Sequence, residues 1–248
     1  MDRAKGGTLD GRASRPFARR DPAEARLGLL AAARLYAARA PPAARESGRR
    51  GGASRVSKTL HETVEEERAK AADRVVELWA EDEHRAGLKP ILRRVWAKKG
   101  QRPIAISHPR YEWLYLYGFV HPASGAVQWF SGSTVDTDLF TQILASFARA
   151  GGAGPKKLIL LVLDGAGWHV SPDLAIPDGI RLVFLPSYSP ELQPAEHLWP
   201  LTNEAIANQH FDTLDELDET LAVRCRVLAT QPDTLKAHTL FQWWPKAA

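Results

Sequence analysis

Cysteine and long apolar runs are scarce in this 248-residue chain, and each absence excludes a class of protein. The single cysteine, Cys225, excludes an internal disulfide framework and fits a reducing compartment. No uncharged apolar run approaches the roughly 18 residues of a membrane span, so we expect a soluble, cytoplasmic protein. No apolar stretch follows the arginine-rich amino terminus, which argues against a signal peptide.

The sequence also lacks the motifs of several enzyme classes. No His/Cys cluster has the spacing of a zinc site, and Cys225 has no visible base partner. There is no glycine-rich phosphate loop of the nucleotide-binding type and no Gly-x-Ser-x-Gly elbow. ATP dependence and serine-hydrolase chemistry are therefore unsupported.

Charge is unevenly divided along the chain. Residues 1–56 contain 13 Lys/Arg and 5 Asp/Glu, a balance of +8; because the whole chain is +4, residues 57–248 must sum to −4. The first segment is rich in alanine and arginine and poor in large apolar residues, so we expect it to be disordered. A solvated basic tail is favoured over a non-specific nucleic-acid-binding segment.

Residues 57–248 have the element order of an α/β domain. The continuous apolar run 157–163 is typical of a central strand covered on both faces. Residues 136–150 repeat apolar side chains at helical spacing, with Asp136 as the N-cap. The whole order predicts a mixed sheet flanked by helices. Strands are predicted at 75–82, 102–107, 113–120, 126–131, 157–163 and 180–185, and helices at 57–73, 136–150, 195–208 and 214–229.

Acidic residues stand at the ends of two predicted strands. Asp164 directly follows the run 157–163, at the sheet edge where α/β folds place their sites, although a turn aspartate is the alternative. The other strand ends in Glu81, Asp82 and Glu83. Alternation along a strand puts Glu81 and Glu83 on one face and Asp82 on the other, and composition alone does not choose between them.

A third acid stands at a predicted helix start. Glu196 follows Pro194, which favours the first turn of a helix, whereas Glu191 follows Ser-Pro and has the character of a loop residue. A carboxylate is also favoured there by the helix dipole alone. Three carboxylates at element ends suggest a cage for a hard divalent cation, which takes oxygen ligands. A pair of such ions suits phosphodiester chemistry.

Four tracts of residues 77–199 have a familiar pattern. They are VELWAEDEHRAGLKPILRRVWAKKGQRP, YLYGFVHPASG, LILLVLDGAGWH and FLPSYSPELQPAEHLW, of which the last is the most specific. The region resembles the DDE transposases of bacterial insertion sequences, in the insertion sequence 630 group related to mariner elements. Two departures are Gln193-Pro194, where Asn-Pro is more common, and the lack of evident DNA-reading helices ahead of the catalytic domain.

The resemblance implies an RNase H-like fold with Asp82, Asp164 and Glu196 as the catalytic, metal-binding triad. It implies two Mg²⁺ ions, replaceable by Mn²⁺, and a homodimer that binds DNA at element ends and target, in association with the nucleoid. The implied reaction is cleavage at terminal inverted repeats and strand transfer into TA dinucleotides. Two alternatives stay open: an inactive remnant that folds and binds DNA, and another RNase H-like nuclease.

Further candidates lie close to the triad in sequence. The tract 87–103 has no acid, contains Trp96, and is a candidate for contact with the DNA backbone, with a solvated hairpin as the alternative. His169 and Glu83 are candidates for supporting positions beside the metal ligands; His84 and His197 have weaker cases. The basic residues of the tract are Lys89, Arg93, Arg94, Lys98, Lys99 and Arg102.

Overall fold

The computed structural model describes residues 49–70, 73–100, 110–186 and 189–245, with 49–55 as backbone only. Most of the basic segment 1–56 and the predicted strand 102–107, with Arg102, lie outside these residues. Helix α1, Arg49–Lys70, covers most of the helix predicted at 57–73 and begins before it, within the segment that we expected to be disordered.

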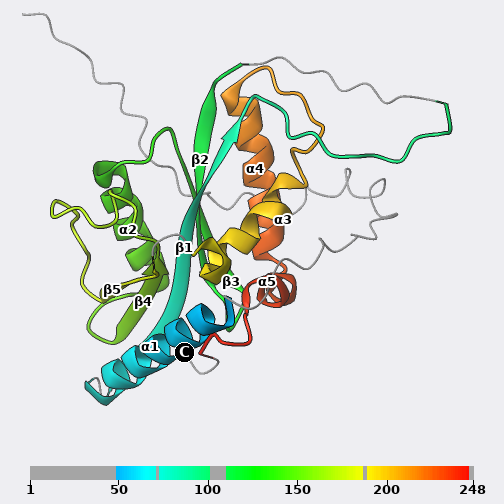
Figure 1. Cartoon of the computed structure of the whole chain (residues 1–248). Coiled ribbons are helices and arrows are strands. Elements are labelled where there is room, and N and C mark those ends of the chain that lie inside the picture. The colour runs from blue at the N-terminus through cyan, green and yellow to red at the C-terminus, as the bar shows by residue number, and fades with distance from the viewer. Residues whose placement is uncertain (1–48, 71–72, 101–109, 187–188, 246–248) are drawn as a thin grey trace, which may run out of the picture.

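Five strands form one mixed sheet in the order β3-β2-β1-β4-β5 (Figure 1). The first three strands make an antiparallel meander, and β4 and β5 run parallel to β1. This order confirms the prediction of an RNase H-like mixed sheet flanked by helices. The strands are β1 Val75–Gly87, β2 Trp113–His121, β3 Ala126–Gly132, β4 Lys157–Leu163 and β5 Ile180–Phe184.

Helix α2, Thr137–Gly151, covers one face of the sheet. Asp136 caps it as predicted, because its side chain accepts a hydrogen bond from the Leu139 amide at 2.8 Å. Phe147 from this helix stacks on Phe119 of β2 with ring centroids 4.2 Å apart and meets Trp79 of β1 edge-on at 5.2 Å. This face therefore holds an aromatic core.

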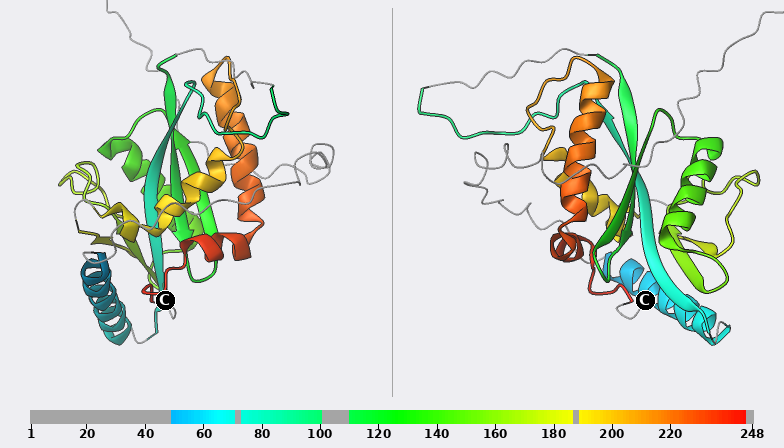
Figure 2. Two further views of the ribbon diagram at one scale, coloured as in Figure 1. Left: turned by 45° about the vertical axis from the view of Figure 1, so that its right-hand side comes forward. Right: turned by 180° about the vertical axis from the view of Figure 1, so that it is seen from behind.

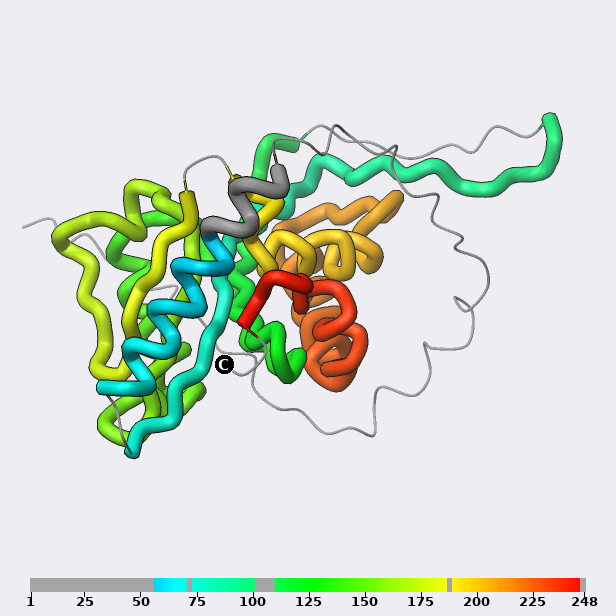
Figure 3. Tube along the Cα trace, turned by 60° about the horizontal axis from the view of Figure 1, so that its bottom comes forward, coloured from blue at the N-terminus to red at the C-terminus, as the bar shows by residue number. Residues whose placement is uncertain are grey.

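The remaining helices lie on the opposite face (Figure 2). They pack on the side chains of β1 that alternate with those facing α2, such as Leu78 and Ala80. Helix α1 runs alongside the parallel strands (Figure 3), where Glu67 forms an ion pair with Arg181 of β5. The elements are η2 Pro190–Leu192, η3 Pro194–Leu198, α3 Trp199–Asn203, α4 Leu214–Ala229 and α5 Pro232–Thr239.

Two predicted elements differ from the structure. The single helix expected at 195–208 is a 3-10 turn, η3, followed by the short helix α3. Pro200 explains the change, because it has no amide hydrogen to donate to Glu196, four residues earlier in the chain. The strand predicted to end at Asp82 continues to Gly87, where it still pairs with β2 at Trp113. Helix α5 was not predicted.

Among the described residues, no helix combines the length and apolarity that crossing a membrane requires.

The aromatic core should carry much of the stability. Phe147→Ala removes a fully buried ring, so the free energy of unfolding should fall by about 3–5 kcal/mol. Val223→Ala, at a half-exposed position of α4, is the control and should change it by less than about 1 kcal/mol. Urea denaturation of both variants measures the difference. Equal midpoints for the two would contradict this account of the core.

Candidate active site

Asp82 lies at the point where the central strand loses one neighbour. Strand β1 pairs with β4 only as far as Ala80, while its pairing with β2 continues and places Asp82 opposite Gly118. A Cβ atom at Gly118 would stand 2.9 Å from the Trp199 ring, so the glycine makes room for this indole over β2. Trp199 donates a hydrogen bond from Nε1 to Asp82 Oδ2 at 2.7 Å.

Asp164 is the first residue after β4, and its side chain is 60% exposed. Its Oδ1 atom accepts two hydrogen bonds, from the Ala166 amide at 2.9 Å and from His169 Nδ1 at 2.9 Å. The histidine bond, aided by that amide, holds the pKa of Asp164 below its usual value. This carboxylate is therefore readily ionised.

Glu196 lies in η3, and Gln193 ties this turn to the sheet. The buried Gln193 side chain donates from Nε2 to the Glu81 carbonyl at 2.8 Å and accepts from the Ala195 amide at 3.4 Å. The glutamine that departs from the more common family pattern thus links the Glu196 turn directly to β1. Burial raises the pKa of Glu196, and the charge of Asp164 adds to this effect.

The three predicted carboxylates interact with one another. Burial raises the pKa of Asp82 to about 8, and the Glu196 charge acts in the same direction, against the Trp199 hydrogen bond. The charge of Asp164 in turn contributes to the raised pKa of Glu196. Among the described residues, no lysine or arginine forms an ion pair with any of the three. Glu191, the competing acid, is exposed on the neighbouring turn.

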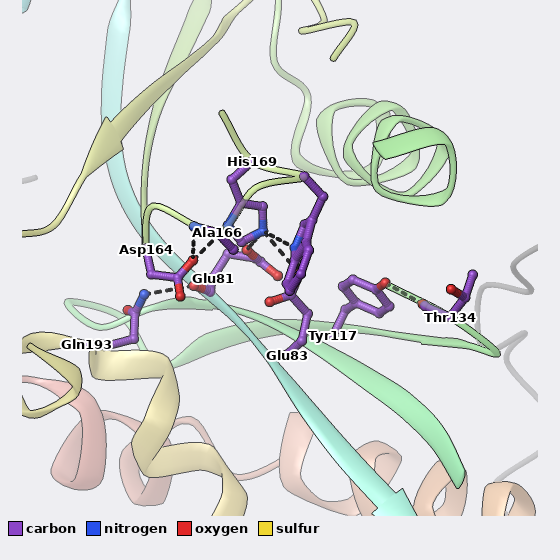
Figure 4. Close-up of polar contacts among 9 residues, drawn as sticks. Glu81, Glu83, Tyr117, Thr134, Asp164, Ala166, His169 and Gln193 are labelled. Atoms are coloured by element: carbon purple, nitrogen blue, oxygen red, sulfur yellow. Dashed lines mark hydrogen bonds and ion pairs between the residues drawn. The ribbon is translucent and has the colours of Figure 1, made fainter. Parts of the chain in front are cut away.

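A second polar cluster lies across β1, on the face toward α2 (Figure 4). As alternation predicted, Glu81 and Glu83 point to this face, where His169 Nε2 lies 3.6 Å from Glu81 Oε2 and 3.0 Å from Glu83 Oε1. Neither oxygen of the fully buried Glu81 has a hydrogen bond, and burial raises its pKa well above the usual value. The spacing of these three side chains would also admit a metal ion.

The other two histidines near the triad have packing contacts. His84 stacks on Trp199 with ring centroids 5.1 Å apart and shares a 2.9 Å hydrogen bond with Asn203. Burial lowers the pKa of His84, which favours its neutral form. His197 meets the Phe241 ring at 4.9 Å. Both histidines are therefore explained without a catalytic role.

The basic tract forms the connection between β1 and β2 and extends away from the body of the domain (Figure 2). Asn208 holds its base: the side chain accepts from the Arg93 amide at 2.8 Å and donates to the Arg93 carbonyl at 3.1 Å. Beyond this anchor, residues 94–100 are exposed, and Trp96 retains 96% of its accessible surface. No carboxylate in the described ranges pairs with the basic side chains of the tract.

Comparison with known proteins gives the family. The sequence profile of the DDE superfamily endonucleases matches residues 77–218, more than half of the chain and the span that contains all three carboxylates. The chain belongs to the DDE superfamily endonucleases. The sequence-based recognition of a DDE enzyme is therefore confirmed as membership of this superfamily.

Two individual proteins are similar in sequence to this DDE endonuclease. The uncharacterized protein y4pE/y4sA of Sinorhizobium fredii is 33% identical over 132 residues, which are 53% of the present chain and 96% of that protein. An uncharacterized 39 kDa protein of insertion element IS630 from Shigella sonnei is 28% identical over 138 residues. That match covers 52% of this chain and only 38% of the Shigella protein.

Solved structures of Mos1 transposase are also similar to this DDE endonuclease. The mariner Mos1 paired-end complex with Mg has a TM-score of 0.45 at 18% identity, over 87% of this chain and 69% of that chain. The Mos1 strand transfer complex has a TM-score of 0.42 at 20% identity, over 84% of this chain and 66% of that chain.

The raised pKa of Asp82 predicts how stability depends on pH without divalent cations. An aspartate in the unfolded chain has a pKa of about 3.9. In the folded protein the pKa of Asp82 is about 8, so this side chain keeps its proton to a higher pH. The stabilisation from this proton is present at low pH and is lost as the pH rises through that window. Asp82→Asn avoids the loss, so the variant should gain stability relative to the wild type between pH 5 and pH 8.5.

Urea denaturation in EDTA at both pH values measures this gain. Asp173→Asn, at an exposed loop position, is the matched control and should show no such trend. A constant difference between Asp82→Asn and the wild type across the range would contradict the assigned burial of this carboxyl group.

Proposed function

We propose that this chain is the catalytic part of a transposase that cuts DNA at transposon ends and transfers the exposed strand into a target. One observation supports the proposal: in a DDE endonuclease, Asp82, Asp164 and Glu196 come from three separate elements, Glu196 is coupled by charge to both aspartates, and no described lysine or arginine pairs with any of them. None of the three positions has lost its carboxyl group, which favours an active enzyme over a decayed remnant.

The donor set fits hard divalent cations. All three side chains offer oxygen atoms, which Mg²⁺ and Mn²⁺ prefer, and two of them have raised pKa values because like charges and burial disfavour ionisation. We propose that the triad holds two Mg²⁺ ions, with Mn²⁺ as a substitute. Such ions would supply the charge that activates the attacking oxygen and stabilises the leaving oxygen.

The protein's own groups prepare the carboxylates. Trp199 fixes Asp82 Oδ2 with its indole N–H, and the turn after β4 occupies Asp164 Oδ1. No hydrogen bond within the described residues uses Asp164 Oδ2, so that atom is left for a ligand. Gln193 sets the position of the Glu196 turn against β1. The two aspartates therefore come to the site with their carboxylates oriented, and Glu196 comes with its backbone held.

We infer that the β1–β2 connection contacts the DNA backbone. Residues 57–248 sum to −4, so attraction to DNA requires a local concentration of positive charge. Lys89, Arg93, Arg94, Lys98 and Lys99 supply one on a projecting segment that contains no acid. Such contacts position a duplex without reading its sequence. Assembly of two copies on paired DNA ends, in a nucleoid-associated complex, belongs to the same proposal.

The triad is tested by removing its charges one at a time. Asp82→Asn, Asp164→Asn and Glu196→Gln should each abolish cleavage of labelled element ends in Mg²⁺ or Mn²⁺, and EDTA should abolish cleavage by the wild type. Glu191→Gln is the matched control and should cleave normally. Full activity in a folded triad variant would remove that residue from the site.

DNA affinity should depend on the basic tract between β1 and β2. Replacing Arg93, Arg94, Lys98 and Lys99 with glutamine should weaken binding to all sequences and reduce the salt slope of log K by about 3 to 4, because fewer counterions are released. The control replaces four exposed basic residues elsewhere, namely Lys58, Lys156, Arg226 and Lys236. Fluorescence anisotropy at a series of salt concentrations measures both. Equal slopes in the two variants would refute the assignment.

A further inference from the structure

The cluster on the α2 face of β1 has a feature that the triad does not explain. Its members are Glu81, Glu83, Trp168 and His169, and its side-chain hydrogen bond to the triad runs from His169 to Asp164. The His169 side chain is almost fully buried and packs against the Phe140 ring of α2 at 4.5 Å. A polar ring enclosed in an aromatic core needs partners for both of its nitrogen atoms.

The imidazole has a carboxylate oxygen at each nitrogen. Nδ1 meets Asp164 Oδ1 at 2.9 Å, and Nε2 meets Glu83 Oε1 at 3.0 Å. The same Glu83 oxygen accepts a hydrogen bond from Trp168 Nε1 at 2.9 Å. Glu83 is thus held by the residue next to His169 as well as by His169 itself. The ring cannot turn without breaking contacts at both ends.

Asp164 needs such a support because its surroundings are loose. It stands just after β4, in a turn containing Gly165 and Gly167, and its side chain is largely exposed. Nothing within 4 Å would meet a Cβ atom at either glycine, so these residues do not enclose the carboxylate, and the turn contributes the Ala166 amide as a hydrogen-bond donor to it. The His169 ring and the Ala166 amide both bind Oδ1, and no hydrogen bond within the described residues uses Oδ2.

We propose that His169 is a positioning residue of the metal site: its Nδ1–H fixes the Asp164 carboxylate, and Glu83 with Trp168 fixes the ring from behind. The inference rests on the proposed function, because it assigns the role through Asp164. Glu81 lies 3.6 Å from His169 Nε2, without a hydrogen bond and fully buried, and closes the ring in from the side of β1. The chain of contacts runs from the α2 core to the metal ligand.

The same three side chains, Glu81, Glu83 and His169, are close enough to hold a cation of their own. The contacts favour positioning, because each ring nitrogen already lies at hydrogen-bond distance from a carboxylate oxygen and Trp168 occupies the shared Glu83 atom. A separate cation site is therefore treated as an outcome that the experiment detects.

Two amide substitutions separate the two ends of the ring. In His169→Asn the amide nitrogen is as many bonds from the backbone as Nδ1, so it can still donate to Asp164. In His169→Gln the amide nitrogen matches Nε2, so it can reach Glu83 but not Asp164. The pair differs by one methylene group, and each variant loses the imidazole from the core.

The readouts are Mn²⁺ affinity of the DNA-free protein, measured by calorimetry, and kcat and KM for cleavage of labelled element ends. His169→Gln should lose about 10- to 100-fold in Mn²⁺ affinity and in kcat, the usual effect of removing a group that orients a metal ligand, with KM for DNA unchanged. His169→Asn should stay within a few-fold of the wild type. Urea denaturation confirms that both variants are folded.

Equal behaviour of the two variants overturns the inference, whether both match the wild type or both are impaired alike, because the second pattern follows from loss of the ring in the core. Mn²⁺ that stays bound to Asp82→Asn but is lost from Glu81→Gln would reveal a separate cation site, with the same consequence. Failure of the proposed function is distinct, since Asp164→Asn would then cleave DNA whatever the His169 variants do.

Discussion

The structure is organised around three successive carboxylates on its central strand. Glu81, Asp82 and Glu83 stand where β1 continues past the end of its pairing with β4, so the sheet opens beside them. Strand alternation directs Glu81 and Glu83 to the face covered by α2, and Asp82 to the opposite face, which the other helices cover. Each face must then accommodate negative charge next to an apolar core, which is costly without compensating partners.

The two faces solve this problem in different ways. On the α2 face, His169 lies among the carboxylates; burial alone would lower its pKa, but bonds to Asp164 and Glu83 raise it to about 10. On the opposite face, burial raises the pKa of Asp82, and the charges of Glu196 and Glu83 add to this effect, against hydrogen bonds from Trp199 and from the Glu83 backbone. The first cluster is therefore balanced by a histidine of the chain itself, and the divalent ions proposed above would balance the second. Clustered, buried carboxylates lower the stability of the fold. Such a loss is expected at a site whose function requires the destabilising arrangement.

Local patterns in the sequence predicted the elements whose determinants are local. Strand β4 and helix α4 have the predicted limits, because a continuous apolar run and a capped helical repeat specify them. The end of β1 was missed because pairing with a distant strand decides it. Likewise, the contact between His169 and Glu83 joins residues 86 positions apart, and only the fold brings them together. Asp82 was chosen over Glu81 by the family resemblance, not by its residue type.

The separation of charge also separates binding from chemistry. A site built from carboxylates repels a phosphodiester, so affinity for DNA has to come from groups outside it and from the cations within it. Arg94, Lys98 and Lys99 lie beyond the Asn208 anchor, on the projecting segment, and form no ion pair with a described carboxylate. If they lay within the site, they would neutralise the acids and compete with divalent cations for them. Because they follow β1 in the chain, this one strand leads from the proposed metal ligand Asp82 to the residues proposed to contact DNA.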